Sequence, residues 1–128
     1  QYFCKVKVPG STPGDGSMIV INTTRSTLIG EDIPIARTFN EEAKGLSGRK
    51  EPAALFFKTR WGIHTFGINF PIDCLVMSDK LEVKAIRENI KPNRFFFWSP
   101  KYKNVLELPA GTVSKTGTIV GDVLEFKL

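Results

Sequence analysis

A succession of short apolar segments, each followed by turn residues, is the feature that most constrains how this chain can fold. Ile72–Met77 and Leu81–Glu88 are rich in apolar and β-branched residues, and Ser78-Asp79-Lys80 between them is typical of a tight turn. Short strands in succession with turns between them predict a mainly β (α+β) domain with a small, mostly antiparallel, barrel-like sheet. The other predicted strands are Met18–Thr23, Ser26–Ile29, Ala53–Thr59, His64–Phe70, Arg94–Trp98, Asn104–Leu108 and Asp122–Lys127.

One real helix is expected to cap this sheet, near residues 39–47. Thr38 and Glu41 have the spacing of a capping box, in which the Thr hydroxyl and the Glu carboxylate each bind a free backbone N–H. Gly45 and Gly48 limit the helix to two or three turns. A second, short helical turn is predicted near residues 110–116.

The N-terminal segment differs in composition from the rest of the chain. Residues 10–17 are dominated by Gly, Ser and Pro, which is typical of a linker, and Met18 then opens a clean apolar strand. We therefore predict that residues 1–17 are a tail or linker foreign to the domain, and that residues 18–128 form a single globular domain. The alternative is that Tyr2–Val8, with its β-type residues, is a genuine strand.

Composition bounds the classes of function. The 128 residues carry a formal net charge of +5, scattered along the chain, which permits an anionic partner without requiring one. No apolar run approaches the roughly 20 residues of a membrane helix, and the N-terminus lacks a secretory pattern. We expect a cytoplasmic protein that has no membrane partner. Its two cysteines and one histidine are too few for a structural zinc site, so we predict no metal and no cofactor.

His64 is the only histidine, and its neighbours are apolar. If the strand runs from His64 to Phe70, then His64, Phe66 and Ile68 share one face, which points into the core or into a pocket. His64 is then a candidate for proton transfer or metal binding. The alternative is a structural histidine that is hydrogen-bonded to the backbone or to Asp73.

Asp73 lies in an otherwise apolar stretch. Burying a lone carboxylate is very costly, so we expect it to be exposed or paired, and Arg49 and Arg60 are the candidate partners. We favour a structural anchor, and the alternative is one wall of a binding site. Cys74 projects to the opposite face of the strand from Asp73, which argues against a shared Cys-His-Asp cluster.

Aromatic and basic residues suggest two further sites. Trp61 lies in a turn, where its ring is placed to flank a ligand pocket or to pack over the end of the sheet. The run Arg94-Phe95-Phe96-Phe97-Trp98 combines cations and rings, a mixture that suits single-stranded nucleic acid, although alternate rings on a strand must face the core. The nucleic-acid candidates are Lys91, Arg94, Lys101 and Lys103.

Four blocks of sequence follow one another along the chain: Ala36-Arg37-Thr38 with Gly45-Leu46-Ser47-Gly48-Arg49; Gly62–Asp73; Ile90-Lys91-Pro92 with Ser99-Pro100; and Val105–Gly111 with Gly121-Asp122. Together they resemble the "domain of unknown function 192" family of small bacterial and archaeal domains. The chain departs from the family pattern at Ile68 and Asn69, where we expect Met and often a basic residue, and at Ser47, where Met is common. The resemblance implies a small domain and brings no agreed reaction.

These observations favour a non-enzymatic binding or accessory module for a small-molecule or protein ligand. Its pocket is expected near His64 and Asp73, flanked by Trp61, Arg49 and Arg60. The first alternative is a hydrolase-like or metal-assisted enzyme that uses His64 and Asp73. The second is a weak nucleic-acid binder that uses the segment 91–103. Elbow, phosphate-loop and dinucleotide motifs are absent, so no catalytic residue is assigned.

Overall fold

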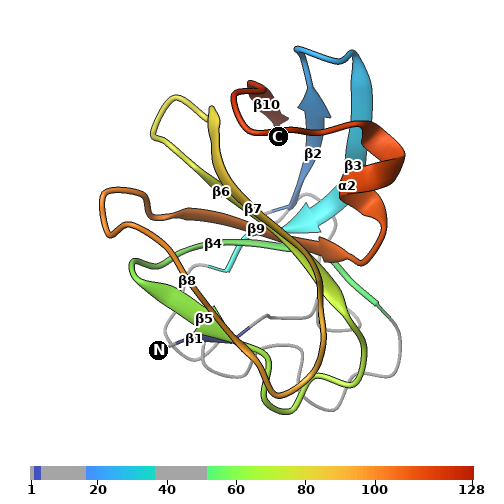
Figure 1. Ribbon diagram of the computed structural model, residues 1–128. Helices are drawn as coiled ribbons and strands as arrows, with labels where there is room; N and C mark the ends of the chain where they lie inside the picture. Colours follow the sequence, from blue (N-terminus) through green and yellow to red (C-terminus); the bar gives the residue numbers. More distant parts are fainter. Residues whose placement is uncertain (1, 4–16, 37–51) are drawn as a thin grey trace.

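The computed structural model describes residues 2–3, 17–36 and 52–128, and Figure 1 shows their arrangement. The described residues form mainly β-structure, as predicted, with one short helix. The predicted helix near residues 39–47 lies outside the described residues. The elements are β1 (Tyr2–Phe3), β2 (Ser17–Asn22), β3 (Thr27–Pro34), β4 (Leu55–Lys58), β5 (Gly62–His64), β6 (Ile72–Met77), β7 (Val83–Ile90), β8 (Phe95–Phe97), β9 (Asn104–Pro109), α2 (Thr112–Thr116) and β10 (Leu124–Lys127).

The strands form three sheets and do not close into the predicted barrel. A four-stranded antiparallel sheet has the order β4-β9-β6-β7. The order β10-β2-β3 forms a second sheet and β1-β5-β8 a third. Isolated bridges, Ile35 to Phe56 and Glu82 to Val123, link the second sheet to the edges of the four-stranded one. In Figure 1 the four-stranded sheet lies between the other two.

β6 lies at the centre of this arrangement, because all six of its residues are buried. Alternate side chains point to opposite faces of a strand. Cys74 and Val76 accordingly pack with residues of β5 and β8, and Leu75 and Met77 pack with residues of β2, β3, β10 and α2. The described residues therefore form two hydrophobic cores, one on each face of the four-stranded sheet.

The predicted hairpin of β6 and β7 is confirmed, and its turn explains where β7 begins. The Ser78 backbone N–H donates to the Glu82 carbonyl, and the Leu81 N–H donates to the Ser78 carbonyl. Leu81 has a φ of 63°, which is a turn conformation rather than an extended one. The strand therefore starts at Val83, two residues later than predicted.

The predicted strand His64–Phe70 is wrong, since β5 ends at His64. The Ile68 N–H donates to the Thr65 carbonyl at 3.2 Å, and Gly67 has a φ of 83°, a left-handed conformation that glycine adopts at little cost. The chain therefore turns at this point. Phe66 is exposed, whereas His64 and Ile68 are buried, so the predicted common face does not exist.

β1 pairs in parallel with β5, placing Tyr2 opposite Ile63 and Phe3 opposite His64. This is the contact that a native N-terminal strand would make, and the described part of the segment contributes Tyr2 and Phe3 to it. The assignment of residues 1–17 to a foreign tail stays a prediction, tested below by deletion.

A buried polar cluster joins the loop before β10 to β2. The Asp122 carboxylate accepts hydrogen bonds from Asn22 Nδ2 and Arg25 Nε, each at 3.0 Å, and from the Ile119 N–H. Asn22 also donates to the Thr118 hydroxyl. Burial alone would raise the pKa of Asp122, but these donors lower it below its ordinary value.

Candidate functional site

Asp73 is completely buried, and three backbone N–H groups bind its carboxylate. Oδ1 accepts from Asn89 at 2.9 Å, and Oδ2 accepts from Gly111 at 3.1 Å and from Val113 at 2.9 Å. The Gly111 and Val113 groups belong to the start of α2, where backbone donors have no partner within the helix. Asp73 therefore holds the end of β7 and the start of α2 to the central strand.

These contacts bring three of the sequence blocks together at one carboxylate. Asp73 ends the block Gly62–Asp73, Asn89 immediately precedes Ile90-Lys91-Pro92, and Gly111 ends the block that begins at Val105. The predicted pairing of Asp73 with Arg60 is wrong, because the Arg60 guanidinium donates to the Pro100 carbonyl at 2.6 Å. Arg49 lies outside the described residues.

His64 ends β5 opposite Phe95 of β8. The side chain is buried, and its Nδ1 accepts from the Phe66 N–H at 3.4 Å. Its ring contacts the rings of Phe66, at 4.9 Å between centroids, and Phe95, at 6.1 Å. Burial lowers the pKa of His64 below its ordinary value, which favours the neutral ring.

Cys74 and Glu107 lie side by side in β6 and β9, and both are completely buried. Burial raises the pKa of the Cys74 thiol well above its ordinary value, and the nearby charges of Glu107 and Asp73 raise it further. A neutral thiol is a poor nucleophile, so this environment does not support a Cys74–His64 catalytic pair. Sequence reasoning missed Glu107, although a glutamate inside an apolar strand is an unusual residue.

Three exposed phenylalanines form what we call the aromatic strip: Phe66, Phe95 and Phe97. Their exposed fractions are 40%, 50% and 63%. Phe95 and Phe97 are stacked, with 5.6 Å between ring centroids and 12° between ring planes, and Phe66 meets Phe95 edge-on at 5.1 Å. Phe96, between them on β8, faces the core. The predicted alternation of this run is thus confirmed, with two rings pointing outward.

Gly62 permits β5 to pair closely with β8, the strand that carries Phe95 and Phe97 of the strip. It lies opposite Phe97, and a Cβ at Gly62 would lie 2.5 Å from the Phe97 ring and 2.6 Å from the Phe96 carbonyl oxygen. Trp61, the residue before it, is 66% exposed, and its carbonyl accepts from the Trp98 N–H. Trp61 therefore marks the Phe97 end of the strip.

Thr65 fixes the loop at the other end of the strip. Its hydroxyl donates to the Lys91 carbonyl at 2.7 Å and accepts from the Arg94 N–H at 2.9 Å. Its own backbone N–H donates to the Arg94 carbonyl at 2.9 Å. The cationic residues Lys91 and Arg94 are thereby held next to Phe95.

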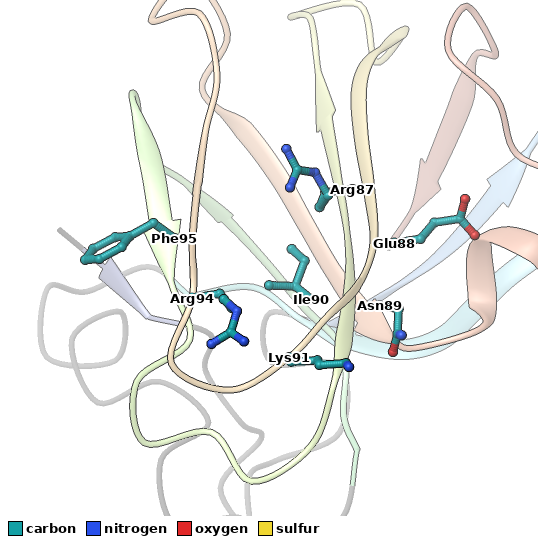
Figure 2. A pocket seen from close by; sticks show the side chains of 7 residues that line it. All are labelled: Arg87, Glu88, Asn89, Ile90, Lys91, Arg94 and Phe95. Atoms are coloured by element: carbon teal, nitrogen blue, oxygen red, sulfur yellow. The ribbon is translucent and has the colours of Figure 1, made fainter.

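A hollow of about 330 Å³ opens beside Phe95, between β7 and the start of β8, and Figure 2 shows the residues that line it. Arg87, Lys91 and Arg94 bring positive charge to it, and Arg87 also lies over the Phe96 ring at 5.0 Å. Glu88 is the acidic residue of this lining, and in Figure 2 it projects from the other side of β7.

The predicted site residues thus lie in different places. His64, Lys91 and Arg94 gather around Phe95, whereas Asp73 is bound by the backbone on the face of the sheet that carries α2. In the described segments, no three His, Cys, Asp or Glu side chains are grouped so that they could hold a metal. None of the helical structure in those segments has the length and apolar character needed to span a membrane.

The fold and these features define a class: a small, mainly β domain of stacked sheets with a buried carboxylate anchor and an exposed aromatic strip. Residues 20–126 match the model of the DUF192 family, described as an uncharacterized ACR. The chain belongs to this family, which confirms the resemblance seen in the sequence.

Two solved structures share the fold. One is a protein of unknown function from Novosphingobium aromaticivorans, with a TM-score of 0.73, 22% identity and 94% of each chain covered. The other, from Sinorhizobium meliloti, is described as "a putative transcription regulator", with a TM-score of 0.71, 23% identity and coverage of 85% of this chain and 91% of that one. No curated protein matches the chain at a significant level.

Proposed function

We propose that this domain is a non-enzymatic binding module whose ligand site is the aromatic strip. The observation that carries the proposal is the stack of Phe95 and Phe97, two rings that are at least half exposed, with Phe66 edge-on to Phe95. Single exposed apolar residues are common on protein surfaces, but a contiguous patch of them is typical of an interaction site.

Hydrogen bonds hold the backbone that carries the strip, which favours binding. Backbone pairing of β5 with β8 fixes Phe95 and Phe97, and the turn at Thr65 fixes Phe66. Rings that are already in place lose little conformational entropy when a ligand stacks on them. The buried ring of His64, whose lowered pKa favours the neutral form, packs against the Phe66 and Phe95 rings of the strip.

The contacts of Asp73 favour binding over catalysis. Three N–H donors occupy the carboxylate of Asp73, and the side chain is completely buried, so it supports α2 rather than a substrate. We therefore place the ligand site at His64 and Phe95, and not at His64 and Asp73. The cytoplasmic location stays a prediction.

A thermal-shift screen tests this function. Wild type would be screened with nucleotides, oligonucleotides, sugars, peptides and metals, in parallel with the variant Phe95→Ala/Phe97→Ala. A ligand at about 100 times its Kd adds about 2.7 kcal/mol of stability, which corresponds to a Tm increase on the order of 10 °C. The matched control is Ile119→Ala/Val120→Ala, since these side chains are also about half exposed, and lie between α2 and β10, away from β8 in Figure 1.

We expect at least one compound to stabilise wild type and the control, and to lose its effect on the Phe95→Ala/Phe97→Ala variant. The proposal is overturned if no compound stabilises wild type, or if every stabilising compound acts equally on both variants.

A further inference from the structure

We propose that the ligand of the aromatic strip is a single-stranded nucleic acid, whose bases stack on Phe95 and Phe97 and whose phosphates bind Arg94 and Lys91. This proposal rests on the function proposed above and adds the class of ligand. It is argued from the rings, from the cations around them and from the distribution of acidic residues.

The two rings stack on each other and remain exposed, so the pair offers a platform on which a base can stack in turn. Phe95 and Phe97 point outward from alternate positions of β8, with 12° between their planes and 50% and 63% of their surfaces exposed. Unpaired bases bind proteins by stacking on exposed aromatic rings of a sheet, and duplex bases are not available for this contact. The platform therefore favours a single strand over a duplex.

Cations lie next to the platform at its Phe95 end. Lys91 and Arg94 line the hollow of about 330 Å³ beside Phe95, whose ring points away from this hollow in Figure 2. Arg87 also lines the hollow, but it lies over the Phe96 ring on the core-facing side of β8. The Arg94 guanidinium donates to the Asn93 carbonyl at 3.2 Å, and the Thr65 contacts hold the Arg94 backbone. The site thus offers a phosphate group the positive charge of Arg94, the residue before Phe95, and that of Lys91 in the same loop.

The Phe97 end of the platform is also basic. Arg60 and Lys101 are exposed there, and the Arg60 guanidinium is bound to the Pro100 carbonyl. A strand that follows β8 would therefore meet cations before and after the two rings. This order of charge, ring, ring and charge matches a strand whose backbone is anionic along its length.

The distribution of acidic residues reinforces this complementarity. Residues 52–72 and 89–106, which contain β4, β5 and β8, hold 6 of the 18 lysines and arginines and none of the 13 acidic residues. Elsewhere the acidic residues outnumber the basic ones. These segments, which include the two strands that carry the aromatic strip, therefore have a net charge of +6, from six basic and no acidic residues. The cations of these segments are Lys58, Arg60, Lys91, Arg94, Lys101 and Lys103.

Fluorescence anisotropy with labelled single-stranded oligothymidine and oligouridine of about 12 nucleotides tests the proposal. We expect wild type and Ile119→Ala/Val120→Ala to bind equally, and Phe97→Ala to bind about 5- to 150-fold more weakly, since that is the effect of losing one stacked base. Phe97→Trp, which keeps a stacking ring, should bind as wild type does. Circular dichroism would confirm that each variant is folded.

The salt dependence tests the phosphate contacts separately. The two cations Lys91 and Arg94 predict a slope of about −1.4 in log K against log salt concentration on a single strand. Arg94→Gln should make this slope shallower by about 0.7 and leave the Phe97 effect in place.

Three results would overturn the proposal. Equal affinity of wild type and the Phe95→Ala/Phe97→Ala variant would mean that bases do not stack on the rings. Duplex DNA or heparin binding as tightly as a single strand would mean that only charge is recognised. If no oligonucleotide binds but another compound of the thermal-shift screen depends on Phe95 and Phe97, the binding module stands and its nucleic-acid ligand falls.

Discussion

Replacing Asp73 by asparagine separates a structural anchor from a functional carboxylate. The substitution keeps the size of the side chain and removes one acceptor oxygen and the charge. In the native protein, Oδ1 accepts one backbone N–H and Oδ2 accepts two, from Asn89 and from Gly111 and Val113 respectively. The amide NH₂ of an asparagine cannot accept, so it must oppose at least one of these N–H groups.

The cost follows from counting these bonds. The least damaging orientation turns the NH₂ group toward Asn89, which loses one hydrogen bond to a charged group, worth about 1.5–3 kcal/mol. The two bonds from Gly111 and Val113 remain but become neutral, which weakens each by about 0.5–1 kcal/mol. Asp73→Asn should therefore lower the free energy of unfolding by about 3–5 kcal/mol and the Tm by roughly 10–20 °C.

Urea and thermal unfolding would measure this loss. Asp79→Asn is the matched control, because it makes the same chemical change at an exposed position of the β6–β7 turn and should alter stability by less than about 0.5 kcal/mol. A double-mutant cycle with Arg60→Ala should show no coupling, since Arg60 binds Pro100 instead. An unchanged or raised Tm for Asp73→Asn would refute the anchor and indicate a carboxylate held for function at a cost in stability.

Four further predictions are testable. Deleting residues 1–17 should leave the Tm almost unchanged if they are foreign, and a loss of several degrees would show that the segment is a working part of the sheet. Gly62→Ala should cost about 1–3 kcal/mol, measured by urea unfolding, because the new Cβ would lie 2.5 Å from the Phe97 ring; a neutral result would contradict this packing. Burial lowers the pKa of His64, so the unfolded state binds more protons than the folded state near pH 6. The free energy of unfolding should therefore fall as the pH drops through about 6.5, and His64→Gln should flatten this dependence in urea unfolding. The lowered pKa of Asp122 stabilises the fold above about pH 4, so Asp122→Asn should remove part of the acid-induced loss below that pH, and an unaltered acid profile would argue against the cluster.

Local sequence determined the elements whose residues interact with their near neighbours. The apolar run Ile72–Met77 and the polar turn after it specify the hairpin of β6 and β7, because turn residues and β-branched residues restrict the backbone wherever they occur. The short helix α2 was likewise predicted, two residues earlier than it begins. The outward positions of Phe95 and Phe97 around Phe96 follow from the two-residue period of a strand.

Tertiary structure decided where β5 ends and what binds Asp73. The run from His64 to Phe70 is apolar enough for a strand, but Thr65 forms hydrogen bonds with the loop at Lys91 and Arg94, residues far away in sequence, and the chain turns there. The partners of Asp73 are backbone N–H groups, which every residue except proline carries, so no sequence pattern distinguishes them. Only the folded chain brings the end of β7 and the start of α2 to that carboxylate, and only the pairing of β5 with β8 places basic loops at both ends of the aromatic strip.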